Sequence, residues 1–168
     1  IQDLIVQGAN NNGINIDDGG SFATPSNQIT LRNLLVQNVG STGNQDGIKL
    51  SGVVDFHIDQ VRIINWGDGG SGVDLVGSHQ GLIENSLLQN HINDTGSGVQ
   101  QKGGTSQITV RANRFDVAGG RPINMGGSTD LQFFRPQPPG TVESSQLLAA
   151  GNVLTDSNTA LAYGGIKD

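Results

Sequence analysis

Several common features are missing from this chain of 168 residues, and each absence narrows its class. It has no cysteine, so it can form neither a disulfide framework nor a thiolate metal site. Charged residues make up only 14%, the formal net charge is -6, and Lys and Arg form no run, so the chain has no basic field for nucleic acid. No apolar run reaches the roughly 20 residues of a membrane-spanning helix. We therefore expect neither nucleic acid binding nor membrane insertion.

Aromatic residues are also scarce, at 4%, and this limits what the core can be made of. Ile, Leu and Val must supply most of it, and these residues pack well on pleated strands. The chain has 26 glycines and many asparagines, both of which favour turns. Apolar residues alternate with polar ones within short runs, and Gly or Asn interrupts every longer stretch, so a helical fold is not expected. The composition indicates an all-β protein with many turns.

One short pattern, a glycine followed by apolar, polar and apolar residues, recurs along the chain. It occupies residues 13–16, 47–50, 72–75, 98–100 and, with Pro in place of Gly, 122–125. The last four copies are about 25 residues apart, which is the period expected when each repeat forms one coil of a solenoid. A coil of this size cannot bury its apolar face alone, so neighbouring coils must stack. The repeat predicts an all-β, right-handed parallel β-helix of about six coils.

The alternation within each repeated strand assigns its two faces. The apolar positions that we expect to stack in the core are Ile14, Ile48, Val73, Val99 and Ile123. The polar positions that we expect to align on the outer face, with coils about 4.8 Å apart, are Asn15, Lys49, Asp74, Gln100 and Asn124. Lys102 ends one of these strands and Arg121 precedes another. This column is either a solvated polar face or a face that binds a ligand.

No shift in composition divides the chain, so we expect a single domain over residues 1–168. Residues 129–145 break the repeat and predict a long loop inserted between two coils. Both ends have strand-like sequences without an amphipathic helix to cover them, which indicates a fragment of a longer stack that contacts further β-helix coils of the same or another chain. Amides recur at one corner of the coils and predict an Asn ladder, at Asn33, Gln60, Asn85, Asn113 and Asn152.

One segment matches a calcium-binding pattern. Residues 69–77 fit a single copy of the nonapeptide G-G-x-G-x-D-x-U-x, with Asp74 at the acidic position. Such a site needs tandem copies, whereas the same position holds Lys49 one coil back and Gln100 one coil on. An ordinary turn and strand is therefore the competing interpretation. A calcium site built on Asp74 and neighbouring loop aspartates is the remaining metal hypothesis, since hard cations need several oxygen ligands.

Residues 102–115 and 118–127 carry a resemblance to a known family. A strand ending in Lys102 is followed by an Ile-rich strand, an Asn-x-Phe corner and a further strand. This arrangement resembles the pectate-lyase-like superfamily, nearest to the branch of chondroitinase B and alginate lyases. The resemblance implies a parallel β-helix, a uronate-containing polysaccharide as substrate and Lys102 as the catalytic lysine. It also implies a bacterial protein that is secreted, periplasmic or on the cell surface.

The chain departs from that family at positions that matter for catalysis. Met125 and Gly126 stand where the family has its catalytic arginine and the histidine after it. Ser97 stands where the family has a calcium-binding acid. The N-terminal residues lack the basic and apolar regions of a signal peptide, so the expected location rests on the resemblance alone.

Two functions fit these residues. The first is a polysaccharide lyase that cleaves by β-elimination, which needs a base for the proton alpha to the uronate carboxylate and a cation to neutralise the enediolate. Lys102 is the candidate base, and Arg121 or a calcium ion near Asp74 is the candidate cation. The second is a non-catalytic carbohydrate-binding or adhesive module. In both, the candidate substrate-binding residues are Lys49, Asp74, Gln100, Asn124 and Asn15.

Overall fold

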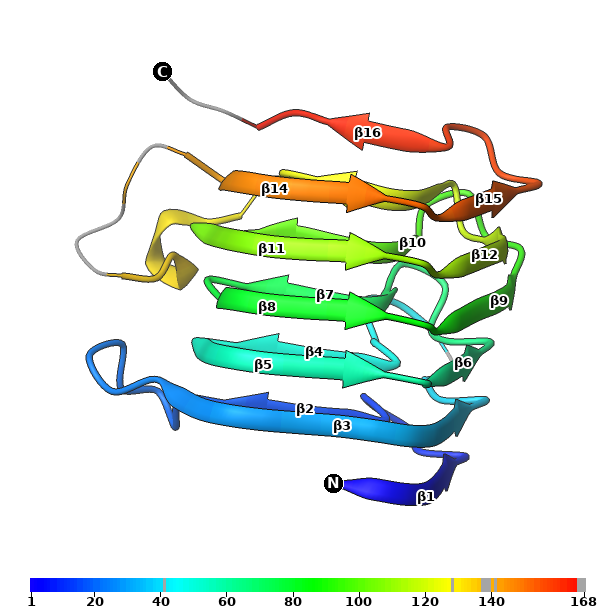
Figure 1. The fold of residues 1–168 in the computed structure, drawn as a ribbon, viewed down its shortest axis with the longest axis horizontal. Helices are drawn as coiled ribbons and strands as arrows, with labels where there is room; N and C mark the ends of the chain where they lie inside the picture. The colour runs from blue at the N-terminus through cyan, green and yellow to red at the C-terminus, as the bar shows by residue number, and fades with distance from the viewer. Residues whose placement is uncertain (41, 128, 137–139, 141, 166–168) are drawn as a thin grey trace.

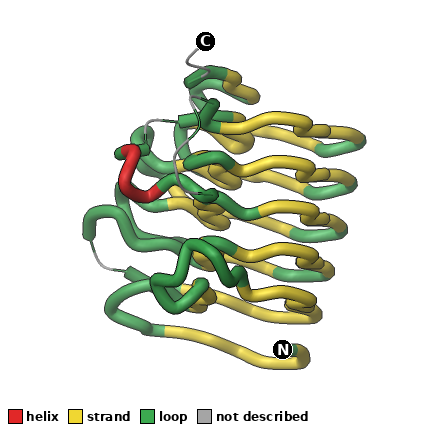
Figure 2. Tube along the Cα trace, turned by 90° about the vertical axis from the view of Figure 1, so that its left-hand side faces the viewer, coloured by secondary structure: helices red, strands yellow, loops and turns green. Residues whose placement is uncertain are grey.

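The computed structural model describes residues 1–40, 42–127, 129–136, 140 and 142–165. It shows a right-handed parallel β-helix of about five turns (Figure 1). Each coil stacks on the one before it, so that strands from successive coils pair in parallel. Figure 2 shows the coils as successive layers from a second direction. The parallel β-helix predicted from the repeat is confirmed, with about five turns where the repeat predicted about six coils.

One face of the β-helix is a six-stranded sheet, called sheet B, and the repeated pattern builds it. Its strands are β2 (Ile14–Asp17), β4 (Ile48–Ser51), β7 (Ser71–Val76), β10 (Ser97–Lys102), β13 (Arg121–Met125) and β16 (Leu161–Tyr163). Stacking explains the glycine of the pattern. A Cβ on Gly47 would lie 2.6 Å from the carbonyl oxygen of Gly72, and one on Gly98 would lie 2.5 Å from that of Pro122. Larger residues at these two positions would push the coils apart.

The other faces belong to a ten-stranded sheet, called sheet A. Its strands are β1 (Gln2–Gln7), β3 (Ser26–Gln37), β5 (Val53–Asp59), β6 (Arg62–Ile64), β8 (His79–Glu84), β9 (Leu87–His91), β11 (Thr105–Arg111), β12 (Arg114–Ala118), β14 (Ser144–Ala150) and β15 (Val153–Thr155). It turns a corner at residues with positive φ, among them Asn33 at 50° and Asn85 at 52°, a conformation in which asparagine is enriched. Asn113 and Asn152 lie one position further along, where Asn113 Nδ2 donates to Asn152 Oδ1 at 3.0 Å. The predicted Asn ladder is therefore divided between two adjacent positions.

A single apolar core runs along the axis of the β-helix. Ile48, Val73, Val99 and Ile123 are fully buried and pair in register from coil to coil. Ile14 belongs to the same column but is only partly buried, because β2 is the last strand at its edge of sheet B. The predicted core column is confirmed. On each of these strands, the residue that follows the core position faces outward.

The connection between β13 and β14 leaves the coil and packs against neighbouring turns. It contains the 3-10 turn η1 (Leu131–Phe133), followed by the buried Phe134. Arg135 then donates its backbone N–H to the carbonyl oxygen of Gly103 at 3.0 Å. Its guanidinium forms an ion pair with the buried carboxylate of Asp18, which directly follows β2, the first strand of sheet B. These bonds hold the connection beside sheet B.

The insertion predicted at residues 129–145 corresponds to this connection. β13 ends at Met125 and β14 begins at Ser144, so the strand repeat is interrupted there. Residues 137–139 and 141 of the predicted range lie outside the described residues. In the part of the chain that the structure describes, no helix is long and apolar enough to cross a membrane.

Candidate functional site

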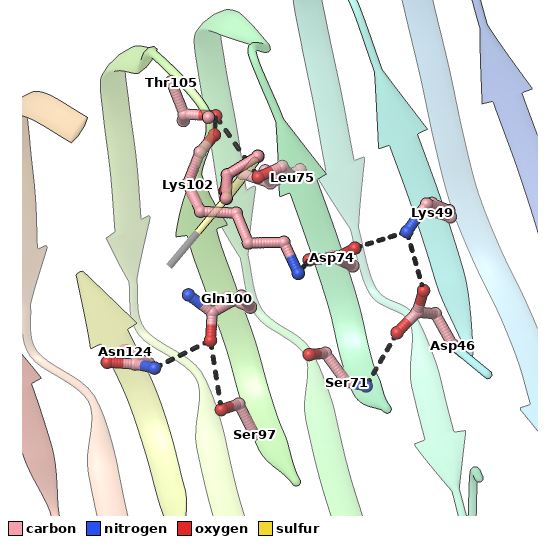
Figure 3. Close-up of polar contacts among 12 residues, drawn as sticks. Asp46, Lys49, Ser71, Asp74, Leu75, Ser97, Gln100, Lys102, Thr105 and Asn124 are labelled. Atoms are coloured by element: carbon pink, nitrogen blue, oxygen red, sulfur yellow. Dashed lines mark hydrogen bonds and ion pairs between the residues drawn. The ribbon is translucent and has the colours of Figure 1, made fainter. Parts of the chain in front are cut away.

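The outer face of sheet B carries the polar column that the repeat predicts. Lys49 pairs in register with Asp74, Asp74 with Gln100, and Gln100 with Asn124. Asn15 pairs with Lys49 one coil earlier. Because neighbouring strands lie about 4.8 Å apart, side chains in such a column can contact one another directly. Figure 3 shows that the column divides into a charged part and an amide part.

Four charged side chains, Asp46, Lys49, Asp74 and Lys102, form an ion-pair chain (Figure 3). Lys49 Nζ lies 3.2 Å from Asp46 Oδ2 and 2.5 Å from Asp74 Oδ2. Lys102 Nζ lies 3.1 Å from the other oxygen of Asp74, Oδ1. The two carboxylates have no exposed surface, whereas the side chains of Lys49 and Lys102 are 24% and 20% exposed. The lysine side chains therefore reach the solvent, whereas the carboxylates do not.

Burial alters the protonation of the ion-pair chain. The pKa of Asp46 is raised to about 6, first by burial and second by the charge of Asp74, against the opposing effects of Lys49 and of the Ser71 N–H. Burial by itself lowers the pKa of Lys49, but the charges of Asp74 and Asp46 outweigh it, so that the pKa is raised overall. Lys49 is therefore a cation at ordinary pH, while Asp46 takes up a proton in mildly acidic solution.

The amide part of the column consists of Gln100 and Asn124, and both are buried. Asn124 Nδ2 donates to Gln100 Oε1 at 2.7 Å, and Ser97 Oγ donates to the same oxygen at 3.4 Å. Gln100 Nε2 donates to the carbonyl oxygen of Gly126. These bonds fix the orientation of both amides, so the surface beside the ion-pair chain is polar, uncharged and ordered.

Two grooves open on this face, and Lys102 lines both. The larger has a volume of about 500 Å³, and its lining includes Gln100, Lys102, Arg121, Asn124, Gly127 and Tyr163. The smaller has a volume of about 370 Å³, and its lining includes Lys49, Lys102, Thr129, Asp130, Phe133 and Arg135. The first lies over β10, β13 and β16, and the second lies between β4, β10 and the β13–β14 connection. Together they extend along the stack over most of sheet B.

The structure brings most of the predicted site residues together. Lys102 and Arg121, the candidate catalytic pair, line the same groove. Asp74 lies beneath Lys102 as its ion-pair partner. Asn15 is separate, because its Nδ2 donates to Asp17 Oδ2 at 2.9 Å and it borders neither of the two grooves. The site therefore begins at Lys49 and runs toward the C-terminal coils.

Asp74 does not fit a calcium ligand. Each of its oxygens lies within 3.1 Å of a lysine ammonium, and these charges oppose the approach of a cation. A calcium ion takes about six to eight oxygen ligands, whereas the register partners of Asp74 are Lys49 and Gln100. Residues 69–77 form a turn followed by strand β7. The calcium hypothesis stays a prediction, without a matching site on this face.

Two acidic residues of the site were not predicted from the sequence. Asp46 comes just before a repeated strand. Its spacing of three residues from Lys49 is the only sequence feature that indicates their ion pair. Glu143 is buried and accepts the N–H groups of Gly103 at 2.8 Å and Thr129 at 2.6 Å. It thereby ties the β13–β14 connection to the turn after Lys102. No sequence signal points to Glu143, because its contacts depend on the path of an irregular loop.

A second charged cluster lies on the outer face of sheet A. Ligand atoms of His57, Asp59 and Glu84 lie within 4.8 Å of one another, and His57 Nε2 is 2.9 Å from Glu84 Oε1. Each carboxylate already has an arginine partner, Arg111 for Glu84 at 2.8 Å and Arg32 for Asp59 at 3.1 Å. The guanidinium groups supply the positive charge that a metal ion would otherwise bring. The cluster is therefore a surface ion-pair network.

No family model, no curated protein and no solved structure matches this chain. The parallel β-helix is consistent with the resemblance to pectate-lyase-like proteins at the level of the fold. Membership of that superfamily stays a prediction.

Proposed function

We propose that the outer face of sheet B binds a uronate-containing polysaccharide and that this chain is a carbohydrate-binding β-helix module. The observation that carries the proposal is the pair of grooves that share Lys102, because ordered amides and partly exposed cations line them side by side. Sugar hydroxyls both donate and accept hydrogen bonds, and side-chain amides do the same. A polysaccharide laid along the stack contacts several coils at once.

The charges that border the grooves favour an acidic sugar. Among the described residues, four cations line them, namely Lys49, Lys102, Arg121 and Arg135, against one exposed acid, Asp130. The carboxylates that balance the two lysines are buried. The exposed guanidinium of Arg121 has the planar shape that binds a carboxylate through two parallel hydrogen bonds. Tyr163 is also exposed, and its ring offers an apolar surface to a sugar ring. A polyuronate, with a carboxylate on each sugar, suits this combination.

The contacts of Lys102 favour binding over catalysis. A general base for β-elimination must accept a proton, but the Lys102 ammonium is paired with the buried carboxylate of Asp74 at 3.1 Å. An ammonium group in such a pair has no free electron pair. Met125 and Gly126 also stand where pectate-lyase-like enzymes carry arginine and histidine. Both observations support the binding module as the first candidate.

A polysaccharide lyase is the second candidate, and one observation favours it. Lys102 and Arg121 line the same groove, so a bound uronate can contact both. In that mechanism, Lys102 leaves Asp74, loses its proton to solvent and removes the proton alpha to the uronate carboxylate. The double bond forms as the bond between the β carbon and the glycosidic oxygen breaks, and that oxygen takes a proton from water. Arg121 stabilises the enediolate charge.

Binding is tested with the Arg121→Ala variant and three polyuronates, namely alginate, polygalacturonate and a glycosaminoglycan, with dextran as the neutral comparison. We expect isothermal titration to show binding to at least one polyuronate, weaker binding to dextran, and about tenfold weaker polyuronate binding by the variant, because a charged hydrogen bond is lost. Arg111→Ala is the matched control, since Arg111 is also exposed but lies on sheet A. Absence of polyuronate binding, or equal loss in both variants, would contradict the proposal.

The lyase candidate is tested on the same polysaccharides by the ultraviolet absorbance of an unsaturated uronate. If elimination occurs, Lys102→Ala should slow it by roughly 100-fold or more, because the general base is lost. The exposed control Arg111→Ala should retain the rate. Binding without any rise in absorbance removes the lyase candidate and leaves the binding module.

A further inference from the structure

Asp46 is the one acid of the ion-pair chain that lies away from Lys102, in the turn before β4. Its side chain has no exposed surface. Oδ1 accepts the Ser71 N–H at 2.8 Å, and Oδ2 accepts from Lys49 Nζ at 3.2 Å. Its own N–H donates to Asn12 Oδ1 at 2.8 Å. Asp46 is thus fixed beneath Lys49, a residue that lines the smaller groove.

The protonation state of Asp46 sets the net charge of the ion-pair chain. The charged groups on the elements around it are Lys49 on β4, Asp17 on β2, Asp74 on β7, Lys102 at the end of β10 and Asp68 in the turn before β7. Asp17 and Asp68 are exposed to solvent, which screens them. Within the ion-pair chain, two ammonium groups balance two carboxylates, so its sum is zero when Asp46 is ionised. Neutral Asp46 leaves the chain with one net positive charge.

We propose that proton uptake by Asp46 controls how tightly the sheet B grooves bind an acidic polysaccharide, with tighter binding when Asp46 is neutral. This inference rests on the proposed function of the same face. When Asp46 is neutral, Lys49 keeps a single carboxylate partner, Asp74, and its partly exposed ammonium is freer to attract an anion in the smaller groove. When Asp46 is ionised, its buried charge opposes the same anion.

The pH range follows from the burial of Asp46. Burial and the charge of Asp74 raise its pKa to about 6, so the change of charge falls between neutral and mildly acidic solution. One unit of charge a few ångströms from a bound carboxylate, with partial solvent screening, changes the dissociation constant by about tenfold. The polyuronate itself stays ionised from about pH 5 upward, since its carboxyl groups have ordinary acidity.

The experiment measures the dissociation constant for polygalacturonate, or for the polyuronate that binds best, at pH 5 and at pH 8. For the unmodified chain we expect about tenfold tighter binding at pH 5. Asp46→Asn keeps the size of the side chain and the oxygen that accepts from Ser71, and it should bind equally tightly at both pH values. Asp17→Asn is the matched control, because Asp17 lies on the same face but is exposed, and it should keep the full pH dependence.

A second measurement reports on Asp46 directly. Its carboxyl carbon, followed by NMR, should titrate near pH 6, and its midpoint should rise when the polyuronate is bound, because the two binding events must affect each other equally. Binding that is independent of pH, or that keeps its pH dependence in Asp46→Asn, would overturn this inference and leave the proposed function intact. Absence of polyuronate binding at both pH values would overturn the two together.

Discussion

At the scale of single residues, Gln101 is a polar side chain in an apolar position of the core. It pairs in register with Leu75, which pairs with Leu50, so its side chain enters the apolar core column. It is fully buried, and neither atom of its amide has a hydrogen-bond partner among the described residues. A buried amide without partners costs about 1–3 kcal/mol. We predict that Gln101→Leu raises the free energy of unfolding by about that amount, as measured by urea denaturation.

The neighbouring Gln100 provides the control for this prediction. Gln100 lies on the outer face of the same strand, and its amide is bonded to Asn124 and to the carbonyl oxygen of Gly126. Gln100→Leu breaks those bonds and should lower the free energy of unfolding. If Gln101→Leu also lowers it, the Gln101 amide has a partner such as an internal water, and its position is not a conflict.

At the scale of elements, Arg135 is one of three residues that hold the β13–β14 connection, together with the buried Phe134 and Glu143. Arg135 pairs with the buried Asp18 carboxylate, and its guanidinium carbon lies 4.4 Å from the centre of the Phe22 ring. Its backbone also packs so closely that a Cβ on Gly104 would lie 2.3 Å from the Arg135 carbonyl oxygen. Arg135 and its neighbours in the connection form one wall of the smaller groove.

We predict that Arg135→Ala speeds hydrogen exchange at the backbone amides of residues 129–135, because removing one partner leaves the buried Asp18 carboxylate uncompensated. The amides of β7 and β10 should exchange as before. Arg135→Lys keeps the charge but loses the planar double contact, so its effect should be intermediate.

Arg114→Ala is the matched control for the loop, since Arg114 is exposed and its pair with Asp116, at 3.6 Å, is a surface contact of little worth. It should leave exchange in the loop unchanged. Unchanged exchange in Arg135→Ala would mean that Phe134 and the Glu143 bonds hold the connection without the arginine.

The elements also show how far the sequence could predict this site. The strands of sheet B and the alignment of Lys49 with Asp74 follow from a local pattern, because a fixed coil length brings equal positions together. The approach of Arg135 to Asp18 spans many coils and depends on an irregular loop, so no period reveals it. Asp46 lies between these two cases. Its spacing of three from Lys49 is local and can suggest the contact, but the sequence does not show that its side chain is fully buried.

At the scale of the whole molecule, the two ends of the stack expose core positions. Leu4 pairs in register with Leu34, and Leu161 pairs with Ile123. The partners in the inner coils are buried, whereas Leu4 is 46% and Leu161 is 44% exposed. Strand edges of this kind favour association, because they present apolar side chains together with unpaired backbone groups.

We predict that a polypeptide of residues 1–168 associates end to end, so that its sedimentation coefficient rises with concentration. Leu161→Lys places a charge on one end of the core and should shift the distribution toward monomer, since charges on exposed edges oppose stacking. Ile92→Lys is the matched control, because Ile92 is apolar and 86% exposed but follows β9 in an inner coil. It should leave the distribution unchanged. A monomer at all concentrations would show that the ends need no cover, and an equal shift in both variants would place the contact on the sides of the stack instead.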